Sequence, residues 1–203
     1  VAVAGVAARK KSGETVSGDA GTCFKRQDGT LCVLLCDGMG SGPEANRESA
    51  LAVRLLEQFL QAGVETEHAL LTLNAALALR GETGFTTVDL LQVDLFNGES
   101  VLYKFGAAPT YIRKGSQVRR LTGTSLPAGL DSGEQVRPDK TLLKLEPGDC
   151  VLMVSDGIVG TIPYRVGSLV SPSMVAPLTT VADISEMFAY FSMTERQLLS
   201  LIR

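Results

Sequence analysis

The sequence contains no tryptophan and a single histidine, His68, among its 203 residues. No second histidine or cysteine accompanies His68, so we expect it on the surface and not as a ligand or catalytic base. The four cysteines form no CxxC pair, which excludes the usual zinc spacing. Cys32 and Cys36 lie in one apolar run and would face the same side of a strand, which predicts buried, reduced thiols.

Long apolar runs and strong charge are also absent. No segment approaches the roughly 20 apolar residues that span a bilayer, and no signal peptide is recognisable. The net charge of −3 argues against nucleic acid as the main partner, because phosphate backbones require clustered Lys and Arg. The chain opens without Met inside a strand-like segment, so we take it as part of a longer protein. We expect a cytoplasmic domain, and a membrane tether in the full-length protein stays open.

The composition that remains is typical of one globular domain. Hydrophobic residues make up 45% and charged residues 20%, and a chain of this length can bury a core without disulfides. Strands come first, then two helices, then many strands, which predicts an α+β fold of layered antiparallel sheets with helices outside. The strands are expected at 1–9, 21–24, 31–36, 86–96, 100–105, 109–114, 117–121, 134–136, 140–145 and 150–155. The helices are expected over 43–62, with Leu51, Leu55, Phe59 and Leu60 on one face, and over 66–79, with Ala69, Leu70, Leu73 and Leu77 on one face.

Three aspartates stand where structure changes. Asp37 and Asp156 each end an apolar strand and precede glycine, and Asp19 follows a Ser-Gly loop. Strand ends that meet at one sheet edge would build an oxygen-rich site of the kind that Mg²⁺ and Mn²⁺ prefer. The alternative is that each Asp-Gly is only a turn, which is how we interpret Asp28-Gly29.

The glycines after Asp37 need a separate explanation. Gly38, Gly40 and Gly42 precede a helix, as in loops that bind phosphate. The segment lacks both the Lys and Ser/Thr of a P-loop and the full dinucleotide fingerprint. We therefore do not predict nucleotide binding.

Six motifs in one order resemble the stage II sporulation protein E phosphatases of the protein phosphatase 2C superfamily. The segment from Asp37 to Ala45 resembles the family's DGMG-x-G-x-x-A signature. The resemblance covers about residues 1–160. The other motifs are Ser17-Gly18-Asp19, Thr86-Thr87-Val88-Asp89, Lys104 to Pro109 with Ile112 to Gly115, Leu126 to Leu130, and Met153 to Ile158.

The resemblance implies an α/β/β/α sandwich of two antiparallel sheets and a metal-dependent Ser/Thr protein phosphatase. It implies two divalent cations, Mn²⁺ or Mg²⁺, with Asp37 bridging them, the Gly38 carbonyl as a ligand, and Asp19 and Asp156 completing the catalytic site. It implies phosphoserine on an anti-anti-sigma-type protein as the substrate, in sporulation or sigma-factor control. The two helices, 43–79, would be a regulatory pair coupled to metal binding and a candidate homodimer surface, so Leu55→Ala should alter Mn²⁺ affinity.

The resemblance ends after Gly160, and we divide the chain into a phosphatase domain, 1–160, and an atypical tail, 161–203. The family's late Asp-Asp pair, which supplies a further metal carboxylate, is absent; Asp183 is the only aspartate there. Either the tail is genuine and one ion is held weakly or lost, or the family's last core strand is missing. Two alternatives to an active enzyme follow, a catalytically silent regulatory module and an oligomerisation domain.

Overall fold

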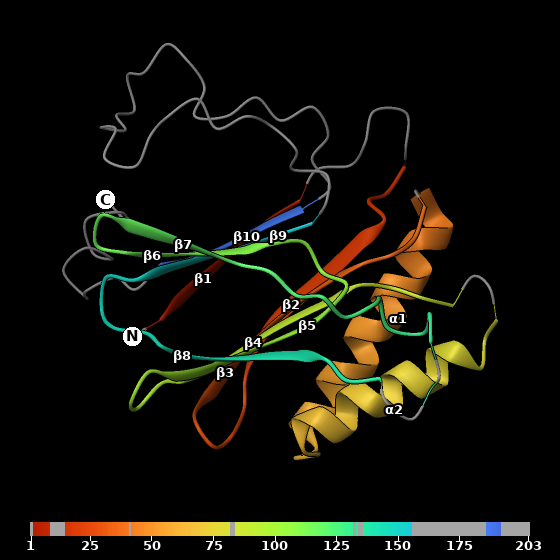
Figure 1. Ribbon diagram of the computed structural model, residues 1–203, viewed down its shortest axis with the longest axis horizontal. Helices are drawn as coiled ribbons and strands as arrows, with labels where there is room; N and C mark the ends of the chain where they lie inside the picture. The colour runs from red at the N-terminus through yellow and green to blue at the C-terminus, as the bar shows by residue number, and fades with distance from the viewer. Residues whose placement is uncertain are drawn as a thin grey trace, which may run out of the picture.

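The domain is built around two stacked five-stranded sheets (Figure 1). The computed structural model describes residues 2–8, 15–40, 42–81, 84–131, 133, 136–155 and 186–191. Every strand pair is antiparallel. Both described helices pack on one of the sheets, at the right of Figure 1. The expected α+β class with two antiparallel sheets is confirmed.

The first sheet has the strand order β1-β10-β9-β6-β7, and the second has the order β2-β3-β4-β5-β8. The strands that follow one another in the second sheet are mostly neighbours in sequence, as hairpins allow. The elements are β1 Val3–Ala8, β2 Asp19–Lys25, β3 Thr30–Asp37, α1 Gly42–Gln61, α2 Thr66–Ala78, β4 Val88–Asp94, β5 Glu99–Phe105, β6 Thr110–Lys114, β7 Gln117–Leu121, β8 Asp139–Lys144, β9 Cys150–Val154 and β10 Glu186–Phe191.

Two apolar cores lie on the two faces of the second sheet. Val33 and Leu35 of β3 pack between the sheets with residues of β6 and β9. Cys32, Leu34 and Cys36 face the other way and pack against the helices. A central strand with both faces covered must be apolar throughout, which is why 31–36 reads as a continuous hydrophobic run.

Helix α1 begins with Pro43 and Glu44 in its first turn, where fixed φ and negative charge are both favourable. It ends before Gly63, whose φ of +82° allows the left-handed cap. The expected apolar face is shifted by one position. Leu56 and Leu60 are fully buried, whereas Leu55 is only partly so.

The inner face of α2 is as expected, with Ala69, Leu70, Leu73 and Leu77 all buried.

Two strand predictions need correction. The expected strand at 134–136 is wrong at Val136, which instead turns back so that its N–H donates to the Gly133 carbonyl at 3.2 Å, and 134–135 lie outside the described residues. The strand expected to start at Thr86 starts at Val88, because Thr86 forms isolated bridges with two other segments.

The segment Glu186–Phe191 is a strand that the sequence analysis did not predict. It lies between β1 and β9 in the first sheet, so a strand from the tail occupies an interior position there. The rest of the tail after residue 160, including Asp183, lies outside the described residues.

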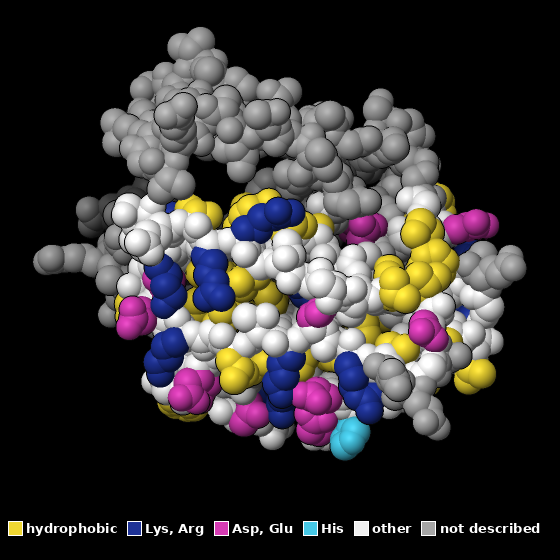
Figure 2. All heavy atoms as spheres, viewed as in Figure 1, with side chains coloured by type: hydrophobic (Ala, Val, Ile, Leu, Met, Phe, Trp, Pro, Cys, Tyr) yellow, Lys and Arg dark blue, Asp and Glu magenta, His cyan; other side chains and the backbone are white. Residues whose placement is uncertain are grey.

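The expected exposure of His68 and the expected burial of Cys32 and Cys36 are confirmed. His68 is exposed over 79% of its side chain and lies at the rim of the molecule (cyan in Figure 2). Cys32 and Cys36 are fully buried on the same face of β3. Among the described residues, no helix is both long and apolar enough to cross a membrane.

Candidate metal centre

Two of the predicted ligands lie directly opposite each other on neighbouring strands. Asp19 is the first residue of β2 and Asp37 is the last residue of β3, and the antiparallel register pairs them. Paired residues put their side chains on the same face, with Cβ atoms about 4.5–5.5 Å apart. This face is the one turned toward the other sheet, since Leu35, two residues before Asp37, packs in the core between the sheets. Two carboxylates therefore share one edge of the sandwich.

The Asp19 carboxylate is buried, with only 2% of the residue exposed. Its Oδ2 accepts hydrogen bonds from the hydroxyl of Ser155 at 3.2 Å and the hydroxyl of Ser17 at 3.4 Å. Its Oδ1 is buried and has no hydrogen-bond partner among the described residues. A buried carboxylate oxygen without a donor is unfavourable unless a cation or water fills the place.

The backbone at Asp37 and Gly38 is fixed by the start of the next strand. The Thr86 hydroxyl donates to the Asp37 carbonyl at 2.7 Å, and the Thr87 N–H donates to the same oxygen at 2.9 Å. In return, the Asp37 N–H donates to the Thr87 hydroxyl at 3.1 Å. Residue 38 also forms a bridge with Thr86. These bonds hold the turn after β3 in one position.

Helix α1 packs against this turn at backbone distance. A Cβ at position 38 would lie 2.1 Å from the Ala45 carbonyl oxygen, so only glycine fits there. The Ser49 hydroxyl donates to the Gly18 carbonyl at 2.6 Å, and the Asn46 amide donates to the Asp19 carbonyl at 3.3 Å. One helix thus holds the chain on both sides of the carboxylate pair.

The residues present fit a divalent cation. The donor set is oxygen, as Mg²⁺ and Mn²⁺ require, and the unpartnered Oδ1 of Asp19 is the kind of atom that a cation satisfies. Among the described residues, no three His, Cys, Asp or Glu side chains lie close enough together to hold a metal ion. The third predicted ligand, Asp156, lies outside the described residues, although Ser155 before it contacts Asp19.

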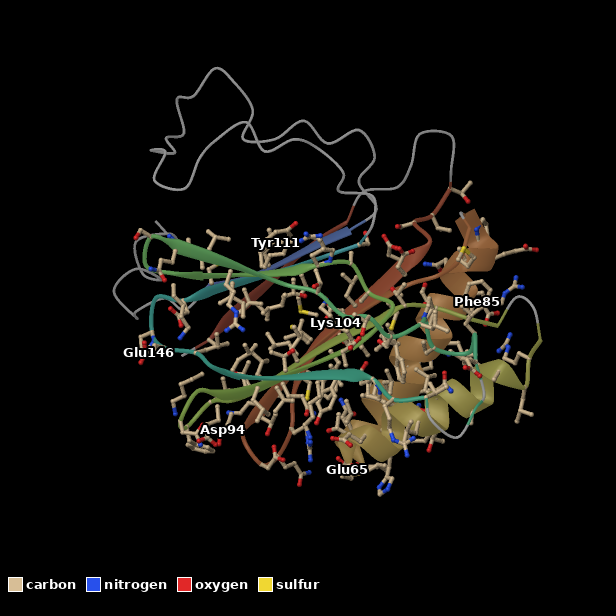
Figure 3. The ribbon with its side chains drawn as sticks, viewed as in Figure 1. Glu65, Phe85, Asp94, Lys104, Tyr111 and Glu146 are labelled. Carbon is tan, nitrogen blue, oxygen red and sulfur yellow. The ribbon has the colours of Figure 1, made fainter. Side chains whose placement is uncertain are left out.

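A buried ion pair lies on the same face of the sheet as the predicted ligands Asp19 and Asp37. Asp89 is the register partner of both Leu35 and Lys104. The Lys104 Nζ is 2.8 Å from Asp89 Oδ2, and the Thr110 hydroxyl donates to the same oxygen at 2.7 Å. Lys104, labelled in Figure 3, lies between the two sheets, and its ammonium also donates to the Ala108 carbonyl at 2.6 Å.

Burial raises the pKa of Asp89, while the neighbouring ammonium and hydroxyl pull it back down. Asp89 Oδ1 has no hydrogen-bond partner among the described residues. The pair ties β4 and β5 to the crossover that leads into the first sheet.

The buried thiols are unsuited to covalent catalysis. Desolvation raises the pKa of Cys36 well above its usual value, and Asp89, Asp37 and Asp19 raise it further. Burial also raises the pKa of Cys32 to about 11. The thiolate is the nucleophilic form, so neither residue is poised to attack a substrate.

Several residues that shape the site were not assigned a role from the sequence. Asn46 of α1 bonds the Asp19 carbonyl at the start of β2, Ser49 bonds the Gly18 carbonyl just before it, and Ser155 bonds the Asp19 carboxylate. Ser49 was missed because the expected apolar face of the helix ran through Leu51 and Leu55, and only the structure shows that Ser49 is buried and so needs a partner. Thr86 was quoted within a motif, but its bond to the Asp37 carbonyl required the structure.

The fold is that of a protein phosphatase 2C-type domain. The solved PP2C phosphatase domain, with a fragment of the regulatory domain, of the cell fate determinant SpoIIE from Bacillus subtilis matches with a TM-score of 0.79 and 26% identity, over 94% of this chain and 63% of that one. RsbX, solved in complex with magnesium, matches with a TM-score of 0.71 and 18% identity, over 93% of each chain.

The sequence comparisons identify the family within this class of fold. The family model of Stage II sporulation protein E matches residues 27–171, so the chain belongs to the Stage II sporulation protein E family. Stage II sporulation protein E from Priestia megaterium and the protein of that name from Bacillus subtilis (strain 168) are each 34% identical over 155 residues, 76% of this chain. The aligned region makes up 26% and 18% of those proteins, so this chain matches about a quarter or less of their length.

Proposed function

We propose that this domain is a metal-dependent protein phosphatase that hydrolyses phosphoserine or phosphothreonine. The observation that carries the proposal is the cross-strand pair of Asp19 and Asp37, in a chain of this family, with a buried Asp19 oxygen that has no donor in the part of the chain that the structure describes. Two divalent cations, Mn²⁺ or Mg²⁺, would be held by Asp19, Asp37, the Gly38 carbonyl and Asp156. When bound, such cations supply an activated water and neutralise charge on the phosphoryl oxygens.

The chain's own residues contribute rigidity and orientation. The hydroxyls of Ser155 and Ser17 hold Asp19 Oδ2, which leaves Oδ1 for a cation. Thr86 and Thr87 fix the peptide of Asp37, so its carboxylate is presented from a stationary strand end. Preorganised ligands of this kind lose little entropy when a cation binds.

The proposed substrate is a phosphorylated anti-anti-sigma-type protein, in the control of sporulation or of a sigma factor. Family membership and the likeness to the phosphatase domain of a cell fate determinant support this assignment. We include in the proposal that the domain works in the cytoplasm, with a membrane tether elsewhere in the full-length protein, and that α1 and α2 provide a homodimer surface. Sedimentation velocity would test the last point, and a monomer at all concentrations would contradict it.

The test is phosphate release from a phosphoserine anti-anti-sigma protein, measured against Mn²⁺ concentration. The wild-type chain should release phosphate in proportion to bound Mn²⁺, and Asp37→Asn should abolish release while retaining the unfolding temperature. Asp139→Asn is the matched control, since that carboxylate accepts bonds from Thr124 and Ser125 and belongs to no metal site in the proposal. Equal activity in wild type and Asp37→Asn would refute the assignment.

A catalytically silent module is the second candidate. It is favoured by the absence of the late Asp-Asp pair that the family resemblance leads one to expect in residues 161–203. Electron paramagnetic resonance of free Mn²⁺ separates the two candidates. Binding of Mn²⁺ without phosphate release would favour the silent module, and binding with release would exclude it.

A further inference from the structure

We infer that Asn74 of α2 is a positioning residue for the candidate metal centre, acting through the loop of residues 126–131. The inference rests on the proposed function, because it concerns the same pair of ligands. The unusual feature is a buried asparagine, 5% exposed, on a helix whose other inward residues are Thr66, Ala69, Leu70, Leu73 and Leu77. A buried amide in apolar surroundings is costly unless its groups are bonded.

Both groups of the Asn74 amide bond the same loop. Its Oδ1 accepts from the Gly129 N–H at 2.8 Å, and its Nδ2 donates to the Asp131 carbonyl at 2.9 Å. The loop also lies tight against the helix. At Gly129, with φ of +90°, a Cβ would be 2.6 Å from Leu77 Cβ and 2.3 Å from the Gly84 carbonyl oxygen. The loop therefore has little freedom to move independently of α2.

The other side of the loop reaches the metal ligands. Ala128 and Thr86 exchange two backbone hydrogen bonds, of 3.0 Å and 2.9 Å. Thr86 in turn bridges residue 38, and its hydroxyl donates to the Asp37 carbonyl at 2.7 Å. Gly38, Thr86 and Ala128 thus form a row of three residues joined by two pairings. An unbroken series of hydrogen bonds links Asn74 to the backbone of Asp37.

This series is separate from the contacts that α1 makes. Helix α1 touches the turn at Gly38 directly, through Ala45, and bonds the carbonyls of Gly18 and Asp19 through Ser49 and Asn46. Helix α2 has its own route, through the loop and Thr86. The Asp37 turn is therefore held from both helices, and loss of the Asn74 bonds should loosen it without touching α1.

The experiment compares Asn74→Leu, which removes both bonds at similar volume, with Leu70→Ala, a fully buried control on the same helix. Amide exchange is measured by NMR in the metal-free protein at Thr87 and Gly38, and Mn²⁺ affinity is measured by electron paramagnetic resonance. Asn74→Leu should speed exchange at both amides and weaken Mn²⁺ binding roughly 3-fold to 30-fold, the usual range for residues that couple through a network. Leu70→Ala should change global stability with neither local effect.

If Asn74→Leu does not fold, Asn74→Ala replaces it, because it removes both bonds without placing extra bulk or a charge at this buried position. Local exchange and Mn²⁺ affinity that match Leu70→Ala would overturn the inference and leave Asn74 as a structural clamp. A wild-type chain that binds no Mn²⁺ would refute the proposed function instead, while the exchange measurement would still decide whether Asn74 holds the Asp37 turn.

Discussion

Replacing Lys104 with Met should destabilise the domain more than most single substitutions. Lys104 is 3% exposed and Asp89 is 1% exposed, so the ion pair is sealed from water. Removing one partner of a buried pair typically costs about 3–5 kcal/mol, because the remaining charge stays buried without compensation. Methionine keeps the length and flexibility of the side chain, so the loss of packing is small.

The expected loss of stability in Lys104→Met can be measured by thermal and by urea unfolding. Domains of this size unfold with a free energy of roughly 5–15 kcal/mol, so a loss of about 3–5 kcal/mol removes roughly a fifth of that free energy or more. The melting temperature should fall by roughly 6–20 °C, at about 2–4 °C per kcal/mol for a domain of 150–250 residues. Urea titration followed by circular dichroism gives the free energy directly, and the slope tests whether the transition stays two-state.

The cost should depend on pH in a defined direction. Burial already raises the pKa of Asp89, and Lys104 opposes that rise, so removing Lys104 raises the pKa further. Above the ordinary Asp range the native variant then retains a proton that the unfolded chain has released, and its stability falls as pH increases. The loss of stability in Lys104→Met should therefore be smaller at pH 5 than at pH 8.

A compensating substitution completes the test. Asp89→Asn removes the stranded charge and keeps an acceptor for the Thr110 hydroxyl, so the double variant should be more stable than Lys104→Met alone at pH 8. A loss below about 1 kcal/mol in Lys104→Met would refute the reasoning. So would a loss that does not change between pH 5 and pH 8, or one that Asp89→Asn fails to relieve.

Three further predictions concern helix coupling, loop geometry and thiol reactivity. Leu56→Ala should lower the free energy of unfolding by about 2–5 kcal/mol, since Leu56 is fully buried. It should also weaken Mn²⁺ binding, because α1 holds the turn at Gly38. Unchanged Mn²⁺ affinity in the folded variant would contradict this coupling. Gly129→Ala should destabilise more than Gly115→Ala, because both glycines have positive φ but only position 129 lacks space for a Cβ, and equal melting temperatures would argue against this packing. Iodoacetamide at pH 8 should label the exposed Cys23 well before Cys36, whose pKa burial raises, and mass spectrometry of the native protein showing equal labelling would contradict that burial.

Much of the fold could be predicted because its signals are local. Segments 31–36 and 150–154 are apolar throughout, and the second helix buries the residues that its spacing predicts. The face of the first helix was misplaced by one residue, because leucines stand at both 55 and 56 and only the tertiary packing selects between them. The strand 186–191 was missed because it pairs with β1 and β9, which are distant in the sequence. No local pattern shows which strands will pair.

The candidate site could likewise be predicted only in part. Asp19 and Asp37 could be selected because each stands at a strand end, and the structure pairs them. Apart from the local bond of Ser17, the bonds that hold them come from residues 27 to 136 positions away, such as Asn46 and Ser155, and no local pattern encodes such distances. The roles of Asp19, Asp37, Gly38 and Asp156 as ligands stay predictions.

The interior place of β10 in the first sheet also bears on how the domain forms during synthesis. Among the described strands, β1 pairs only with β10, with Val3 opposite Phe191, whereas the last described strand of the second sheet ends at Lys144. At ribosomal rates of 5–20 residues per second, β1 waits roughly 10–40 s for its partner to be synthesised. The helical half of the domain can therefore be folded while the first strand is still unpaired, and that strand is exposed to wrong partners throughout the interval.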